Sequence, residues 1–367
     1  MPHLVAIDLP GGDGFVTALR REWDAGNAVL PIDRRLPSPA RSALLAAMAP
    51  TRLVDVEGTH ALDGRPIDEG DALVMATSGS TGTPKGVILT HAAVAASAHA
   101  TSSRLGTTAS DTWLACLPLA HVGGLSVVTR ALLTGARLVV HDGFDAAAVV
   151  AAAQAGATAV SLVATALRRV DPSLFRVIVL GGARPPADRP PNCVATYGLT
   201  ETGSGVVYDG RPLDGVDVVI GDDGEVLLRG PMLLRGYRDG TTPLDADGWL
   251  HTGDLGHWLP DGRLHVEGRR GDLVITGGEN VWPDTVEAVI ERHPDVAEVA
   301  VAGVPDEEWG QRVVAWVVPT DPATPPSLQD LRAFTATFLP AFCAPKELRL
   351  VSTLPRTALG KVQRHRL

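Results

Sequence analysis

A stretch rich in glycine, serine and threonine surrounds a single lysine, Lys85, between Met75 and His91. Glycines let the backbone adopt unusual dihedral angles and bring amide groups close to a ligand. Serine and threonine hydroxyls donate hydrogen bonds to phosphate oxygens, and a lysine ammonium adds a point charge that suits phosphate. This composition predicts a phosphate-binding loop after a strand. The loop comprises Thr77, Ser78, Gly79, Ser80, Thr81, Gly82, Thr83 and Lys85.

The loop differs from the two best-known glycine motifs for nucleotides. Pro84 and Gly86 break the Gly-x-x-x-x-Gly-Lys-Ser/Thr pattern of the Walker A loop, and the stretch contains no Gly-x-Gly-x-x-Gly dinucleotide motif. A generic stretch rich in glycine and serine is at least as often a polar surface loop. Composition alone therefore leaves both interpretations open.

Further residues that could do chemistry stand in short motifs downstream of the loop. They are His121 in LPLAHVGGL, Glu201 in YGLTETG, Asp254 in WLHTGDL, Arg269 in GRRGD and Lys361 in PRTALGK. An ionised aspartate only accepts hydrogen bonds and can receive two hydroxyl groups, while glutamate oxygens suit a hard cation such as Mg²⁺. Taken singly, each residue has an ordinary alternative, such as a core histidine, a turn carboxylate or a solvated surface charge.

The order of these motifs resembles that of the adenylate-forming enzymes, the superfamily of acyl-CoA synthetases, luciferases and peptide-synthetase adenylation domains. SGSTGTPKG, from Ser78 to Gly86, is similar to their phosphate loop, and LGGA, from Leu180 to Ala183, is similar to the segment that flanks adenine. The resemblance covers nearly the whole chain from Ala72 onward. Upstream of Ala72 the chain is shorter than the family usually is, and Gly271 stands where many members have a lysine before the hinge aspartate.

The resemblance implies roles for these residues with ATP and magnesium. Thr200 meets the α-phosphate and Glu201 holds the magnesium ion. Asp254 and Arg269 bind the ribose. Lys361 bridges the attacking carboxylate and the α-phosphate in the transition state. The other residues implied to bind the nucleotide or coenzyme A are Gly181, Gly182, Ala183, Tyr197, Gly198, Gly277 and Gly278.

The implied reaction joins two negative partners, a carboxylate and the α-phosphate of ATP. Catalysis therefore depends mainly on positioning and on stabilising charge. The acyl group then passes to the cosubstrate coenzyme A after the small domain rotates about Asp272, and the segment from Thr276 to Pro283 lines the pantetheine channel. The implied catalytic residues are Lys361, Thr200, Glu201 and His121, the last of which faces the acyl pocket.

The amino-acid sequences of three segments suggest the acid substrate. LPLAHVGGL, SLVATALRR and GRRGDLVITGGENVWP look most like the short form of the o-succinylbenzoate-CoA ligases of menaquinone biosynthesis. A dicarboxylate needs a cationic pocket end, which Arg130, Arg168 or another group could provide. Other aryl- or acyl-CoA ligases, an adenylation enzyme that loads a separate carrier protein and a non-catalytic nucleotide-binding scaffold remain alternatives. Candidate pocket residues are His121, Ser161, Thr165, Gly181, Tyr197, Ser204 and Val206.

The elements that must position these residues indicate an α/β fold. Between Leu73 and Val207, short apolar runs alternate with alanine-rich segments, which predicts a layered α/β domain with a largely parallel sheet. From Val216 to Val274, Asp-Gly pairs between strand-like runs predict hairpins and a β-rich section. We predict an ATP- and acid-binding domain over residues 1–271 and a small, mobile α+β domain over residues 272–367.

One charge-free stretch, Ala146 to Leu167, is long enough to raise the question of a membrane span. It is rich in alanine, and Gln154 and Gly156 interrupt it. Asp145 can cap a helix that ends near Gly156, after which TAVSLVA predicts a buried strand. A helix followed by a strand is therefore expected here, and no membrane span.

Composition excludes some classes of partner. The chain has 367 residues, of which 45% are hydrophobic and 20% charged, as is ordinary for a globular protein. Its formal charge of -10 gives no general electrostatic reason to bind nucleic acid or an anionic membrane. Cys116, Cys193 and Cys343 lie far apart, and the start of the chain lacks the pattern of a secretory signal, so a cytoplasmic location is expected. Many family members are dimers, so a homodimer is implied by the resemblance alone.

Overall fold

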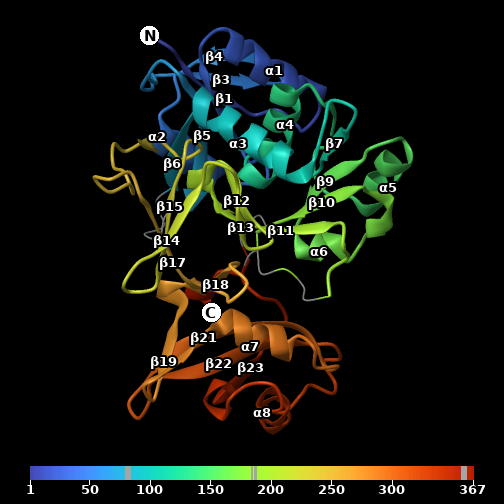
Figure 1. The fold of residues 1–367 in the computed structure, drawn as a ribbon, viewed down its shortest axis with the longest axis vertical. Coiled ribbons are helices and arrows are strands. Elements are labelled where there is room, and N and C mark those ends of the chain that lie inside the picture. Colours follow the sequence, from blue (N-terminus) through green and yellow to red (C-terminus); the bar gives the residue numbers. More distant parts are fainter. Residues whose placement is uncertain (79–83, 183–184, 186–187, 357–361) are drawn as a thin grey trace. The chain divides into compact units, whose positions relative to one another are not determined.

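The computed structural model describes residues 1–78, 84–182, 185, 188–356 and 362–367 (Figure 1). The chain divides into two compact units. The first unit comprises Met1–Val219, Leu227–Thr252 and Leu259–Leu264, and the second comprises Ile220–Val226, Gly253–Trp258 and His265–Leu367. The second unit thus contains residues 272–367 together with three short segments from the β-rich section, residues 220–226, 253–258 and 265–271.

The first sheet of unit 1 holds the strand that leads into the glycine-rich loop. Among the described residues its order is β16-β6-β5-β2-β1-β3-β4. Strands β1, β2, β3 and β5 run parallel, whereas β6 is antiparallel to β5. The apolar runs of β1 and β2 are completely buried, which explains why they form central strands. The strands are β1 (Leu4–Ile7), β2 (Ala28–Pro31), β3 (Arg52–Asp55), β4 (Gly58–Ala61), β5 (Asp71–Ser78), β6 (Pro84–Thr90) and β16 (Gly236–Tyr237).

The second sheet of unit 1 holds the YGLTETG motif. Its order in the described part of the chain is β13-β12-β11-β10-β9-β7-β8. Strands β7 to β11 are parallel to their neighbours, as the alternating pattern predicts, and β12 and β13 add an antiparallel edge. The strands are β7 (Thr112–Ala115), β8 (Arg137–Val140), β9 (Ala159–Leu162), β10 (Val177–Leu180), β11 (Cys193–Leu199), β12 (Ser204–Tyr208) and β13 (Arg211–Pro212).

Helices connect and cover these two sheets (Figure 1). Helix α3 packs on β5 and β6, helix α4 packs on β7 and β9, and the two helices pack on each other. The charge-free stretch is a helix followed by strand β9, and the Asp145 carboxylate caps the helix by accepting from the Ala148 N–H at 2.8 Å. The helices are α1 (Asp13–Asp24), α2 (Ser38–Met48), α3 (His91–Leu105), α4 (Val122–Thr134), α5 (Ala146–Gln154) and α6 (Ala164–Leu167).

Both predicted Asp-Gly hairpins are present in a sheet of order β14-β15-β17-β18. Helix α7 begins at Pro283 as predicted, and it buries Val286 and Ile290 in the core of unit 2. Within the described residues, no helix combines the length and the apolar character needed to cross a membrane. The remaining elements are β14 (Asp217–Ile220), β15 (Glu225–Arg229), β17 (Leu250–Trp258), β18 (Leu264–Arg269), β19 (Val274–Thr276), β20 (Glu279–Val281), α7 (Pro283–Ile290), β21 (Val296–Asp306), β22 (Gly310–Pro319), α8 (Leu328–Ala336) and β23 (Glu347–Leu350).

Candidate active site

The glycine-rich loop connects two paired strands of unit 1. Antiparallel pairing sets Thr77 opposite Lys85 and Ser78 opposite Pro84, so the two ends of the loop lie side by side. The Thr77 hydroxyl donates to the Lys85 carbonyl at 3.4 Å. The loop residues Gly79, Ser80, Thr81, Gly82 and Thr83 lie outside the described residues.

Lys85 and Glu201 are brought together by a tyrosine, Tyr237. The Lys85 ammonium lies 4.7 Å from the centroid of the Tyr237 ring, a cation–π distance. The Tyr237 hydroxyl donates to Oε1 of Glu201 at 2.9 Å. Tyr237 is placed by strand β16, which pairs with β6. A cation and a carboxylate therefore share one aromatic side chain at the edge of the first sheet.

Glu201 and Thr200 lie in a short 3₁₀ turn, Thr200–Thr202, that follows strand β11. The turn is fixed by the buried Thr202, whose hydroxyl accepts from the Leu199 N–H at 2.9 Å and donates to the Ser204 carbonyl at 2.6 Å. Directly before the turn, a Cβ atom at Gly198 would lie 2.3 Å from the Ser204 carbonyl oxygen, so only glycine fits. The sequence YGLTETG thus sets the direction of Glu201 through its neighbours.

The segments predicted to flank adenine lie at the ends of parallel strands β10 and β11. Gly181 and Gly182 follow β10, and Tyr197 lies on β11 beside the register shift at Gly198. Ligands of α/β sheets bind at the carboxyl ends of such strands. Ala183 lies outside the described residues.

His121 belongs to a cluster that the sequence analysis did not anticipate. Its Nε2 lies 3.3 Å from Oδ2 of Asp33 and 3.4 Å from Nη2 of Arg35. Burial would raise the pKa of Asp33, but hydrogen bonds from Arg35 outweigh it and hold that pKa at about 2. Burial lowers the pKa of His121 below 6.5, although the Asp33 carboxylate opposes this shift. The arrangement favours a neutral imidazole held beside an ionised aspartate.

Arg130, one of the two arginines considered for a second substrate carboxylate, is enclosed in unit 1. Its side chain projects from α4, is 1% exposed, and stacks over the Trp113 ring at 4.6 Å. Its Nε and Nη1 have no hydrogen-bond partner among the described residues. Arg130 is among the residues that line a small cavity, whose volume of about 10 Å³ has room for one water molecule. The lining includes Ser97, Ser126, Thr129, Leu73, Leu125 and Gly203.

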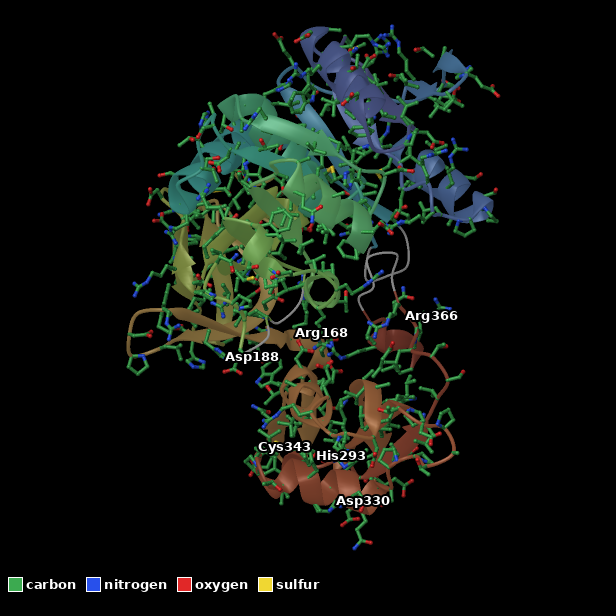
Figure 2. All side chains as sticks on the ribbon, turned by 90° about the vertical axis from the view of Figure 1, so that its right-hand side faces the viewer. Arg168, Asp188, His293, Asp330, Cys343 and Arg366 are labelled. Atoms are coloured by element: carbon green, nitrogen blue, oxygen red, sulfur yellow. The ribbon has the colours of Figure 1, made fainter. Side chains whose placement is uncertain are left out.

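Because Gly203 directly follows the turn with Glu201, the Arg130 cavity adjoins the YGLTETG motif. The alternative, Arg168, is exposed at the end of α6 (Figure 2). Of the other candidate pocket residues, Ser161 and Ser204 are buried, whereas Thr165 is exposed.

In unit 2, Asp254 and Arg269 form an ion pair. Nε of Arg269 lies 2.9 Å from Oδ1 of Asp254, whose side chain is 8% exposed. The two residues lie on β17 and at the end of β18. Gly277 and Gly278 form the turn between β19 and β20 with φ of 61° and 84°, where glycine is favoured. Lys361 lies outside the described residues.

Sequence comparison places the chain among known proteins. A family profile described as AMP-binding enzyme matches residues 54–238, and one described as AMP-binding enzyme C-terminal domain matches residues 285–361. The chain belongs to the AMP-binding enzyme family. The two matched regions of this AMP-binding enzyme include the Lys85–Tyr237–Glu201 group and the position of Lys361.

Several relatives of this AMP-binding enzyme are named for o-succinylbenzoate (2-succinylbenzoate). A probable 2-succinylbenzoate-CoA ligase of Mycobacterium tuberculosis is 39% identical over 370 residues, covering 93% of this chain and 95% of that protein. The o-succinylbenzoate CoA synthetase (MenE) of Bacillus subtilis, solved with the acyl-adenylate OSB-AMP, superposes with a TM-score of 0.88 at 28% identity over 99% of this chain and 87% of that chain. The same bacterial enzyme, solved with ATP and magnesium, gives a TM-score of 0.88 at 29% identity, covering 99% and 89%.

Sequence reasoning missed Tyr237 and Asp33. Tyr237 lies in a two-residue strand, and only its long-range pairing with β6 brings it to Glu201. No local signal in RGYRDG reveals this contact. Asp33 had a weak signal, because a carboxylate just after a buried strand of a parallel sheet lies at the edge where ligands bind.

Proposed function

We propose that the chain is an ATP-dependent ligase that adenylates o-succinylbenzoate, releases pyrophosphate and transfers the acyl group to coenzyme A, a step of menaquinone biosynthesis. The observation that supports this acid most directly is Arg130, a buried guanidinium with two unpartnered nitrogens beside the YGLTETG motif. The names of the relatives support the same reaction.

Adenylation needs groups that hold phosphates and offset negative charge. Lys85 supplies a cation, and the hydroxyls of the loop from Thr77 to Thr83 supply donors. Glu201 fits a magnesium ion, because Tyr237 occupies only its Oε1. No cluster of three or more metal-ligating side chains occurs among the described residues, as expected for a cation bound by one carboxylate and substrate phosphates. When bound, magnesium would neutralise phosphate charge. Thr200 contacts the α-phosphate.

The acid would bind with one carboxylate at the reaction centre and the other near Arg130. Asp33 already neutralises Arg35, whereas Arg130 has no carboxylate partner in the described structure. A buried charge without a partner is costly, and an anionic ligand removes that cost. The cavity beside Arg130 has room for one water molecule, so the side chains around it would have to move to admit a carboxylate. His121, fixed by Asp33, would face the body of the acid.

The remaining roles follow the family pattern. Asp254 and Arg269 bind the ribose, Gly277 and Gly278 line the path of the pantetheine, and Lys361 stabilises the adenylation transition state. The domain over residues 272–367 rotates about Asp272 between the two half-reactions. The proposal places the protein in the cytoplasm, where ATP and coenzyme A are available. A homodimer is proposed from the resemblance to the family alone.

The deciding experiment supplies purified protein with ATP, magnesium, coenzyme A and one acid at a time. Pyrophosphate and AMP are measured, and the thioester is identified by mass. Preferential turnover of o-succinylbenzoate over benzoate, succinate and medium-chain acids is expected. Turnover of a different acid alone would refute o-succinylbenzoate as the substrate. Acyl transfer only to a carrier protein would refute coenzyme A as the acceptor. The absence of pyrophosphate and AMP with every acid would refute the assignment as an enzyme.

A further inference from the structure

Arg364 is the centre of a group of charges that the proposed function does not use. It lies three residues after Lys361, at the start of a short 3₁₀ turn, and its side chain is 14% exposed. Its Nη1 donates to Oδ2 of Asp272 at 3.2 Å, and Nη2 donates to Oε2 of Glu287 at 2.7 Å and to Asp284. Its Nε donates to the Val301 carbonyl at 3.1 Å. All three guanidinium nitrogens are therefore engaged within unit 2.

The partners of Arg364 come from separate elements. Asp272 ends the 3₁₀ turn Arg270–Asp272, Asp284 and Glu287 lie three residues apart on α7, and Val301 belongs to β21. Glu287 is itself fixed, because its Oε1 accepts from the Val301 N–H at 2.7 Å. Arg364 thus connects Asp272, the predicted hinge residue, to the helix and the sheet of the small domain.

Arg364 supplies the positive charge that these carboxylates share. Three carboxylates face one guanidinium, and burial raises the pKa of Glu287 even though Arg364 opposes the shift. Without the arginine, the carboxylates would repel one another in a partly dry environment. Arg364 is therefore the group on which their mutual placement depends.

The backbone beside Arg364 is also fixed. Val362 forms a β-bridge with Arg356, and the Gln363 N–H donates to the Pro355 carbonyl at 2.8 Å. Val362 packs against a buried cluster that includes Trp316 and Leu354. Three residues of chain span at most about 11 Å, so whatever fixes Arg364 limits how far Lys361 can move relative to Asp272.

We propose that Arg364 is a positioning residue for adenylation, which fastens the chain segment with Lys361 to Asp272. This inference rests on the proposed function, because it assigns Arg364 an effect on the step that Lys361 serves. A fixed Arg364 keeps Lys361 within the reach of three residues, about 11 Å, as the small domain moves. A misplacement of about 1 Å can cost on the order of 10²-fold in rate.

The test compares Arg364→Gln and Arg364→Lys in both half-reactions, in the wild-type and Lys361→Ala backgrounds. Arg364→Gln is expected to lower kcat of adenylation about 10²-fold and to leave KM for ATP and the acid within about threefold. Thioester formation from preformed acyl-adenylate is expected to survive, and Arg364→Lys is expected to restore part of the rate. Added to Lys361→Ala, Arg364→Gln is expected to have no further effect, because it acts through the lysine.

A purely structural role predicts other results. Equal losses in both half-reactions, or an additive loss on top of Lys361→Ala, would overturn the proposal. The matched control is Arg312→Gln, since Arg312 also pairs with two carboxylates in unit 2, Glu347 and Asp306, but does not contact Asp272. It is expected to keep the adenylation rate. If Arg364→Gln fails to fold, Asp272→Ala removes the hinge contact and leaves the bonds of Arg364 to Asp284 and Glu287 in place. It is expected to lower adenylation in the same selective way, while an unchanged rate would overturn the proposal.

A readout independent of activity separates this inference from the proposed function. Hydrogen exchange of the Gln363 amide, which donates to the Pro355 carbonyl, is expected to speed up at least tenfold in Arg364→Gln, and unchanged exchange would overturn the connection. A normal adenylation rate in Lys361→Ala would instead refute the role proposed for Lys361, whatever the exchange shows.

Discussion

Arg130 in unit 1 and Arg364 in unit 2 are both largely enclosed, yet their surroundings are opposite. Arg364 has a hydrogen-bond partner on all three nitrogens and three carboxylates around it. Arg130 stacks on Trp113, and its Nε and Nη1 have no partner within the described residues. The same side chain is neutralised by the fold in one unit and left uncompensated in the other.

This difference indicates that the charge of Arg364 maintains the structure, whereas the charge of Arg130 is available to bind a ligand. Burying an unpaired cation costs several kcal/mol, which folding must offset elsewhere. Such a cost is expected at a binding site, where the ligand supplies the missing anion. A saturated arginine has no capacity left for a ligand, so its effect on function must pass through its neighbours.

The largest expected effect is that of Arg130→Met on the acid. Methionine fills a similar volume without the charge, so kcat/KM for o-succinylbenzoate should fall about 10²-fold or more, as expected for a lost buried ion pair. Turnover of benzoate, which has no second carboxylate, should be unchanged. Steady-state pyrophosphate release with the two acids measures the ratio. An equal loss for both acids would place Arg130 outside the acid site and remove the contrast with Arg364.

The free energy of unfolding should fall more when Arg364 is replaced than when Arg130 is replaced. Arg364→Met leaves three carboxylates unpaired and should lower the free energy of unfolding of unit 2 by about 3–5 kcal/mol. Arg130→Met removes an unpaired buried charge and should leave the stability of unit 1 unchanged or higher. Urea unfolding, resolved by hydrogen exchange of amides in α7 and α4, reports the two units separately. A comparable loss in both variants would show that Arg130 is already neutralised.

A smaller effect is expected at Tyr237. Tyr237→Phe keeps the ring beside Lys85 but removes the hydrogen bond to Glu201, which as a bond to a charged group is worth about 1.5–3 kcal/mol. The apparent affinity for magnesium in the ATP reaction should change about tenfold. Titration of activity with magnesium measures this change. The matched control is Tyr208→Phe, which loses a hydroxyl contact to Thr101; the same magnesium shift there would argue against a specific role for Tyr237.

Sequence reasoning reached residues that sit in ordered local motifs and missed those joined by long-range packing. Glu201 was proposed because YGLTETG resembles a contiguous family motif, and the structure shows that the turn of this motif is fixed by its own Thr202. Arg130 and Arg168 could not be separated, because the burial of a helical arginine depends on the elements that pack against it. The alternation of apolar runs between Leu73 and Val207 was sufficient for the parallel strands of the second sheet of unit 1. Strands β1 to β4 of the first sheet lie upstream of that range, where the sequence analysis predicts no strands. The division into units was harder, since β17 and β18 contribute to both units.

The smallest expected effect concerns pH and His121. Its pKa is lowered by burial, so the unfolded chain binds the proton more readily than the folded chain below pH 6.5. Stability linked to His121 is therefore fully present above 6.5 and is lost as the pH falls from 6.5 through the lower folded pKa. His121→Gln should reduce the loss of unfolding free energy between pH 7.5 and 5.5, as measured by urea unfolding at each pH. An unchanged dependence of the unfolding free energy on pH would mean that Asp33 completely offsets the effect of burial on the pKa of His121. His121 would then resemble Arg364, whose charge is compensated by neighbouring carboxylates, and not Arg130.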